Sequence, residues 1–132
     1  MSNQDYLPVS VRAAAILTGS YVAGTVIGPL TTLSNPALQN QLNVMVAFTI
    51  GSLTTAEIKV EYSVDGTTYF QDTFEAISGG TATMTLGAYQ LSATGNYVIS
   101  IPIKFPYIKI SAKGTGTATS SEMTITAILG VV

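Results

Sequence analysis

The sequence predicts an all-β protein: an antiparallel β-sandwich or jelly roll of about 7–9 strands with an extended N-terminal arm. Three observations lead to this prediction. Apolar and polar residues alternate with period two over much of the chain from Gln41 onward. Short segments rich in Gly, Ser and Thr separate the alternating stretches. No stretch combines a helical period with capping residues, and the segment 35–42, with Pro36 at its first helical position, is long enough for one turn at most.

The length of 132 residues suits one domain. A chain of this size removes roughly two-thirds of its unfolded surface from water, so it folds without disulfides or a structural metal. We expect residues 1–12 to form the arm and residues 13–132 to form a single β-sandwich domain.

The N-terminal segment differs in character from the rest. It begins polar, and Pro8, Pro29 and Pro36 interrupt any long strand pairing. We expect an extended arm followed by strands over 11–17 and 21–27. The arm either lies along a neighbouring subunit or is an ordinary first strand with a frayed end, and the sequence leaves both interpretations open.

Two segments show the alternation most clearly, "QLNVMVAFTI" and "AEIKVEYSV". Each places apolar residues on one face and mainly polar residues on the other, as in a strand with one face in a core and one in water. The expected inward residues are Leu42, Val44, Val46, Phe48 and Ile50 in the first segment, and Ile58, Val60, Tyr62 and Val64 in the second. The expected outward residues of the second segment are Glu57, Lys59, Glu61 and Ser63.

The dipeptide Asp65-Gly66 follows the second segment and predicts a β-hairpin with a type I′ turn, which needs positive φ at both central residues. The partner strand is expected within residues 67–77. Asp65 and Gly66 are therefore interpreted as structural turn residues that set the strand register. Further strands are expected over 96–103, 107–114 and 121–130.

The composition excludes most enzyme chemistry. The chain has no Cys and no His, so it lacks thiolate nucleophiles, imidazole bases and the common nitrogen ligands of transition metals. Asp72 and Glu75 are three residues apart and face opposite sides of a strand, while Lys59 lies between Glu57 and Glu61. We expect no enzyme, no catalytic residue, no cofactor and no identifiable metal site.

Charge and hydropathy exclude two further classes of partner. The five basic residues are too few and too scattered to track a phosphate backbone, so no nucleic acid is expected. The apolar segment 12–30 is interrupted by Gly, Ser and Thr and follows Asp5, so neither a signal peptide nor a membrane role is expected.

The surface is unusual for a free monomer. Only 9% of the residues are charged, against about 25% in a typical soluble domain, and the mean hydropathy is +0.44. Such a surface offers little charge repulsion against self-association. We expect a homodimer or homotrimer, or a subunit of a larger particle.

Aromatic residues are the remaining candidates for ligand binding. They either stack on sugars or, more commonly, fill a sandwich core and form cross-strand pairs. The residues in question are Tyr62, Tyr69, Phe70, Phe74, Tyr89, Tyr97 and Tyr107.

The hairpin "KVEYSVDGTTYF" resembles the Tyr-Ser-x-Asp-Gly-x-x-Trp hairpin of discoidin-type carbohydrate- and lipid-binding jelly rolls, with Tyr69 in place of the Trp. It also resembles the Asp-box of sialidases, one residue short in spacing. The matched residues form the turn in both families, so neither resemblance brings a binding site with it.

A second resemblance covers the chain from about Gln41 to the C-terminus. The features that carry it are a strand ending "FTIGS", the Asp-Gly hairpin, "YVISIPI" and "YIKISAKGTGT". In this order they resemble small structural proteins of tailed bacteriophages, the decoration (cement) proteins of icosahedral heads and related head-fibre proteins. The resemblance implies a sandwich subunit, a homodimer or homotrimer, docked on a capsid shell.

We therefore expect a non-enzymatic virion structural protein on the outer surface of the capsid, with the major capsid protein and itself as partners. A decoration protein would stabilise the shell by bridging capsid subunits. Within the arm, Tyr6, Leu7, Val9 and Arg12 are the expected capsid or neighbour contacts. The alternatives are a tail or neck subunit, and a glycan-binding adhesion module on a phage head or tail fibre with Tyr69, Tyr89 and Tyr107 as its platform.

Overall fold

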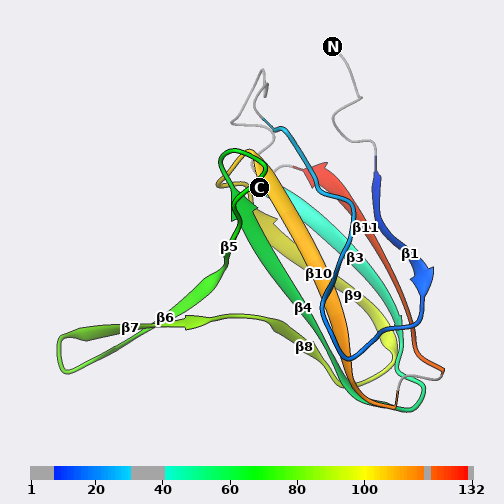
Figure 1. Ribbon diagram of the computed structural model, residues 1–132. Coiled ribbons are helices and arrows are strands. Elements are labelled where there is room, and N and C mark those ends of the chain that lie inside the picture. Colours follow the sequence, from blue (N-terminus) through cyan, green and yellow to red (C-terminus); the bar gives the residue numbers. More distant parts are fainter. Residues whose placement is uncertain (1–7, 31–40, 118–119, 131–132) are drawn as a thin grey trace.

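The computed structural model describes residues 8–30, 41–117 and 120–130. These residues form antiparallel β-strands and contain no helix, so the all-β sandwich prediction is confirmed (Figure 1). No helix in this part of the chain is long and apolar enough to cross a membrane. Of the segment 35–42 considered for a helical turn, residues 35–40 lie outside the described residues, and Gln41 and Leu42 belong to a strand. The strands are β1 (Val9–Ala15), β2 (Val22–Ala23), β3 (Gln41–Thr49), β4 (Leu53–Ser63), β5 (Phe70–Gln71), β6 (Thr73–Ser78), β7 (Thr81–Leu86), β8 (Tyr89–Leu91), β9 (Gly95–Pro102), β10 (Tyr107–Gly116) and β11 (Glu122–Gly130).

Two sheets form the sandwich. The first, sheet A, has the order β1-β11-β3-β9, and the second, sheet B, has the order β2-β10-β4-β5, with β8 also paired to β4. The strands β6 and β7 pair only with each other among the described strands and project from the sandwich as a two-stranded ribbon (Figure 1). The described strands number eleven, more than the expected seven to nine, because three of them are only two or three residues long and because the ribbon was not expected.

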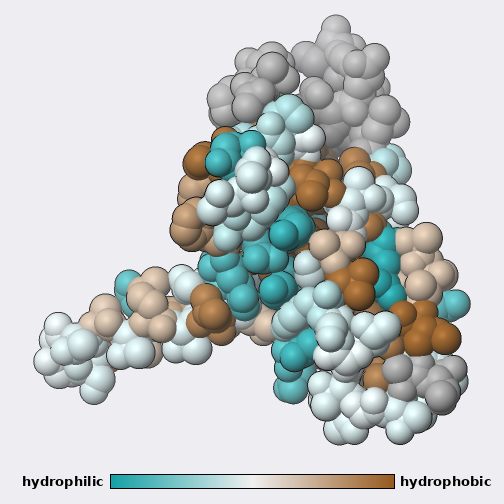
Figure 2. Space-filling model, in the orientation of Figure 1, coloured by the Kyte–Doolittle hydropathy of each residue, from teal (hydrophilic) through white to brown (hydrophobic). Residues whose placement is uncertain are grey.

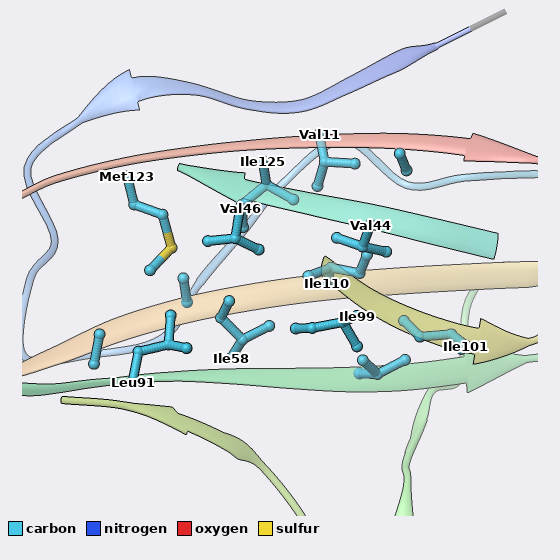
Figure 3. Packing of buried hydrophobic residues seen from close by; sticks show 14 of the residues in the cluster. Val11, Val44, Val46, Ile58, Leu91, Ile99, Ile101, Ile110, Met123 and Ile125 are labelled. Atoms are coloured by element: carbon cyan, nitrogen blue, oxygen red, sulfur yellow. The ribbon is translucent and has the colours of Figure 1, made fainter. Parts of the chain in front are cut away.

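The core lies between the two sheets, as the alternation predicts. The four inward residues of β3 are each at most 3% exposed, and Ile58, Val60 and Tyr62 of β4 are at most 5% exposed. Figure 3 shows three of them, Val44, Val46 and Ile58, in one cluster with labelled side chains of β9 (Ile99, Ile101), β10 (Ile110) and β11 (Met123, Ile125). Burial of one such side chain is worth about 1.5–3 kcal/mol. Val64 is an exception at 68% exposed, because β4 ends at Ser63 and the chain turns away there.

The chain from Val9 is already part of sheet A. β1 begins at Val9 rather than Val11 and pairs with β11, with Val9 opposite Ala127 and Val11 buried at 2% exposure. The boundary expected after residue 12 therefore falls inside a strand. For residues 9–12 the structure matches an ordinary first strand. The strand expected over 21–27 is reduced to β2 and a single bridge between Ile27 and Ile108.

The prediction of a type I′ turn at Asp65-Gly66 is wrong. Gly66 has φ of +77°, but every described residue with positive φ is a glycine, so Asp65 does not have the required conformation. Tyr62 pairs with Phe70, which leaves a loop between β4 and β5 instead of a two-residue turn. The partner strand β5 is two residues long.

The two-residue turn with positive φ at both positions lies instead at Gly79-Gly80, with φ of +57° and +81°. It joins β6 to β7, where Ser78 lies opposite Thr81. Gly-Gly satisfies the backbone demand of a type I′ turn because neither residue carries a Cβ.

The ribbon is an excursion from the edge of sheet B. β5 pairs with β4 at Tyr62, and β8 pairs with β4 at Ile58, so both ends of the excursion return to the same strand. Two hydrogen bonds close its base. The Gly87 N–H donates to the Asp72 carbonyl at 3.0 Å, and Gln71 Nε2 donates to the Gly87 carbonyl at 2.9 Å.

Candidate interaction surfaces

The outer face of sheet B carries a dense group of charges. β4 contributes Glu57, Lys59 and Glu61, and β10 contributes Lys109 and Lys113. Register places them together, since residues directly opposite in an antiparallel pair share a face. Figure 2 shows this hydrophilic area over β4 and β10.

Tyr21 covers one half of this charged group. Its hydroxyl donates a hydrogen bond of 2.8 Å to Glu57 Oε1, and its ring lies under Lys59 Nζ at 4.5 Å and Lys113 Nζ at 4.9 Å. Burial, together with the hydrogen bond and negative charge of Glu57, raises the pKa of Tyr21 to about 12. The loop before β2 is thereby held against the sheet.

The other half is covered by Tyr69. Lys109 Nζ lies 4.2 Å from the centre of the Tyr69 ring and 3.9 Å from Glu61 Oε1, which Lys59 Nζ also approaches at 3.7 Å. The three lysines of this face are thus balanced by carboxylates and rings of the same chain. Such a face has little unmatched positive charge for an anionic ligand.

The outer face of sheet A, unlike that of sheet B, carries little charge. Its three long strands, β3, β9 and β11, present one charged residue on this side, Glu122, at the end of β11. Met45 lies opposite Val98 of β9 and Thr126 of β11. Met45 is 48% exposed and Val98 is 70% exposed, and a shallow pocket lies among these residues. This is a nearly charge-free surface with its largest apolar side chains at the centre.

The ribbon is the second exposed apolar element. Four large side chains on it are between 58% and 72% exposed: Phe74, Ile77, Met84 and Leu86. Opposite residues share a face, so Ile77 and Ala82 lie on the same side as Met84 and Leu86, while Phe74 lies on the other side among threonines. Figure 2 shows the ribbon standing clear of the sandwich.

Of the expected arm contacts, Tyr6 and Leu7 lie outside the described residues. Val9 lies on the edge strand of sheet A and is 38% exposed. Arg12 is engaged with its own chain: its Nε donates to the Met123 carbonyl at 3.2 Å, and one terminal nitrogen donates to the Ile16 carbonyl at 2.9 Å. Arg12 thus ties β1 to β11.

The three tyrosines of the glycan platform do not share a face. Tyr107 lies opposite Ser63, and Tyr69 contacts Lys109, so both are on the outer face of sheet B. Tyr89 lies opposite the buried Ile58 and is therefore on the inner side, at the sheet edge. The structure brings Tyr69 and Tyr107 to one side and leaves Tyr89 on the other.

A different aromatic group lines a pocket at the base of the ribbon. The pocket has a volume of about 260 Å³ and is bordered by Tyr62, Phe70, Asp72, Lys104 and Phe105, with neighbouring backbone. The Tyr62 and Phe105 rings lie 5.3 Å apart. The Tyr62 hydroxyl is buried without a hydrogen-bond partner among the described residues, and burial, with the nearby charge of Asp72, raises its pKa.

Asp65 organises the loop between β4 and β5. Its Oδ1 accepts hydrogen bonds from the backbone N–H groups of Thr67 and Thr68 at 2.8 and 2.9 Å. These bonds, together with one from Ser63, lower the pKa of Asp65. Gly66 lies against the Tyr107 ring, where a Cβ would come within 3.1 Å of ring carbons. No group of three or more acidic residues gathers in the described ranges to hold a metal ion.

The fold defines the class of this protein as an antiparallel β-sandwich with a projecting two-stranded ribbon. The crystal structure of the PBSX exported protein XepA has a similar fold, with a TM-score of 0.63 and 10% sequence identity. The match covers 100% of this chain and 39% of that chain. A scan against protein-family models and a search of curated proteins each find no match.

Sequence reasoning missed both apolar surfaces. The outward residues of β3 looked mixed, because Met45 and Ala47 alternate with Asn43 and Thr49 and only pairing with Val98 makes the face apolar. The ribbon had a visible signal in "SGGTATMTLG", a Gly-Gly turn followed by alternation.

Proposed function

We propose that this protein is a non-enzymatic structural component of a tailed-phage virion, a decoration protein that docks on the outer surface of the head. It bridges subunits of the major capsid protein and thereby stabilises the shell. The observation that carries the proposal is the nearly charge-free outer face of sheet A, with Met45 and Val98 exposed at its centre and Glu122 at the end of β11. The similar fold in a protein whose name links it to the PBSX phage supports the phage setting.

The outer faces of the two sheets have different roles in this proposal. A face whose lysines and carboxylates are already matched within the chain, as on sheet B, gains little from a partner and keeps the particle soluble. A partly apolar sheet face with little charge, such as the outer face of sheet A, loses little on desolvation when it is covered. Stable contacts bury about 1,200–2,000 Å² in total, and repetition over a symmetric shell strengthens each weak contact.

β1 borders the docking face. β1 is the edge strand of sheet A, and Val9 is exposed there. Tyr6, Leu7 and Val9 are proposed as contacts to a capsid neighbour, while Arg12 holds β1 in place through its bonds to the Met123 and Ile16 carbonyls. Deletion of residues 1–8, which spares β1, is expected to lower occupancy on heads and leave the sandwich folded.

The decisive experiment compares two valines of equal exposure. Val98, on the docking face, is 70% exposed, and Val64, in the loop after β4, is 68% exposed. Val98→Asp is expected to abolish binding to heads that lack this protein, because it leaves a charge buried at the interface. Val64→Asp is expected to bind normally. Equal binding by both variants would show that sheet A does not face the capsid.

One observation favours a second function, a glycan-binding module. The pocket beside Phe70 combines exposed aromatic surface with the Asp72 carboxylate, a pairing suited to the apolar face and hydroxyl groups of a sugar ring. Phe70→Ala should abolish saccharide shifts in an NMR titration if the pocket binds. A loss caused instead by Tyr69→Ala and Tyr107→Ala would place binding on sheet B. Immunogold labelling of virions distinguishes a head position from a tail or neck position.

A further inference from the structure

Both strands of the ribbon have an edge that pairs with no other described strand. The ribbon consists of two strands, so each strand has one free edge, and a row of free N–H and C=O groups is a template for another strand. A two-stranded hairpin is marginally stable by itself in water. Its six-residue strands are nevertheless fully formed, with residues 73–78 opposite residues 81–86.

The direction of the backbone groups on β7 follows from the turn. In a two-residue hairpin the residues that flank the turn, here Ser78 and Thr81, exchange hydrogen bonds, and such pairs then alternate along the ribbon. The hydrogen bond from the Gly87 N–H to the Asp72 carbonyl fits the same alternation. Thr83 and Thr85 therefore point their backbone groups towards β6. The outward groups belong to Ala82, Met84 and Leu86.

Charge distinguishes the two free edges. β7, with the sequence TATMTL, carries no charged residue, whereas β6 carries Glu75 at its centre, directly opposite Met84. Pairing of β6 with a copy of itself would bring two Glu75 carboxylates into neighbouring positions, which is unfavourable. Pairing of β7 with itself meets no such repulsion.

We propose that two copies of this chain pair through their β7 edges, antiparallel, about a two-fold axis at Met84. A register centred on Met84 uses all three outward residues of each strand. Met84 lies opposite the partner's Met84, and Ala82 lies opposite the partner's Leu86. About six backbone hydrogen bonds result, because each of the three pairs exchanges two. The two ribbons become one four-stranded sheet.

The side chains favour this register as well. It preserves the alternation of faces, so Ala82, Met84 and Leu86 from both copies form one continuous apolar strip, with Ile77, Glu75 and Thr73 of each copy beside it. The opposite face becomes a ladder of threonines flanked by Phe74 of each copy. Isologous pairing of this kind closes on itself and gives a dimer rather than a fibre.

This dimer specifies the stoichiometry and the interface of the homo-oligomer, and its biological role rests on the proposed function. Its test uses purified protein without phage heads. A failure of dimerisation and a failure of head binding are therefore separate results.

Disulfide trapping tests the register. The chain has no native Cys, so any disulfide in a single-Cys variant joins two copies. In Met84→Cys the two Cα atoms lie about 5.5 Å apart across the axis, within the range of about 4.4–6.8 Å that a disulfide needs. We expect rapid dimer formation under mild oxidation. In Glu75→Cys, on the far edge, the two Cα atoms are separated by about three strand spacings, roughly 14 Å, so no cross-link is expected.

Proline substitution tests the backbone bonds. Met84→Pro removes an N–H that points to the partner and no bond within the ribbon, so it is expected to halve the mass found by light scattering. The matched variant Ile77→Pro also loses a large apolar side chain, but its missing N–H points away from the dimer joint, and it is expected to remain a dimer. A monomeric native protein at all concentrations, a dimeric Met84→Pro, or equal cross-linking of Glu75→Cys and Met84→Cys would each overturn the proposal.

Discussion

The side chains of Ser63 and Asp65 are hydrogen-bonded to each other where β4 ends and the following loop begins. Ser63 Oγ donates a hydrogen bond of 2.9 Å to Asp65 Oδ1, and the same Oγ accepts from the Gly66 N–H at 2.9 Å. Ser63 is 1% exposed although it belongs to the polar face of β4. A serine that satisfies three polar groups at a strand end explains why the chain turns there instead of continuing into a hairpin.

This arrangement makes the loop sensitive to acid. Since backbone hydrogen bonds lower the pKa of Asp65, its contribution to stability is present above the unfolded-state pKa and is lost as the pH falls through the folded-state pKa. We expect an NMR titration midpoint for the Asp65 carboxyl below the ordinary value for Asp. The melting-temperature gap between the native protein and Asp65→Asn should shrink at low pH. Glu75→Gln removes the same charge from the ribbon and is the control. If its melting-temperature gap to the native protein shrinks by the same amount at low pH, the acid sensitivity does not come from Asp65.

Gly24 is required where the segment after β2 passes close to β1. A Cβ at this position would lie 2.4 Å from the Val11 carbonyl oxygen, and the adjacent Thr25 N–H bonds to that same carbonyl at 2.8 Å. Gly24→Ala is expected to lower the free energy of unfolding by about 1–3 kcal/mol, since the backbone must shift. Gly19→Ala, where nothing lies within 4 Å, should change it by less than about 0.5 kcal/mol. Urea denaturation of both variants measures the difference.

Ile110 is a central contact of the core. It is 1% exposed and lies on β10, opposite Val60 of β4. Ile110→Ala is expected to cost about 2–5 kcal/mol through lost burial and the cavity left behind. Val22→Ala, on the neighbouring strand and 46% exposed, is the matched truncation and should cost far less. Equal losses in thermal denaturation would mean that the core does not lie between the sheets as described.

Tyr21 is expected to anchor the loop before β2 through Glu57. Tyr21→Phe keeps the ring under the lysines and removes the hydrogen bond, so a loss of about 1 kcal/mol is expected. Because the pKa of Tyr21 is raised to about 12, the folded state favours its neutral form, and this contribution is lost as the pH rises from about 10 towards 12. Ultraviolet titration of the phenols should show one late-titrating group fewer in the variant. If the phenol lost in the variant is one that titrates near the ordinary value of about 10, the contact is contradicted.

The alternation in β3 and β4 could be interpreted from the sequence because both strands have one face in the core and one in water. Leu42 to Phe48 and Ile58 to Tyr62 behave as predicted. The prediction fails at Val64 and at the Asp65-Gly66 turn, where hydrogen bonds of Ser63 compete with hairpin geometry. Local propensity allows either outcome there, and the contact of Gly66 with the Tyr107 ring belongs to a distant strand.

The candidate surfaces were harder to predict. The platform of Tyr69, Tyr89 and Tyr107 could not be judged without the register, because one-residue differences in pairing move a side chain to the other face. The sequence places Arg12 in an exposed arm, but its guanidinium donates hydrogen bonds to the carbonyl groups of Met123 on β11 and of Ile16 just after β1. The bond to Met123 joins residues 111 positions apart, which local sequence does not reveal.

The sequence by itself determined the class of fold, the inward faces of the long strands, the lack of Cys and His, and a surface poor in charge, since each depends only on residue types and on periodicity. Only the tertiary structure decided which strands are neighbours. That choice makes one sheet face charged and the other nearly charge-free, and it leaves the β6–β7 ribbon without a partner among the described residues. The physical reason is that an outward side chain acquires its chemical surroundings from the strands beside it, and strand order is fixed by packing across the whole core.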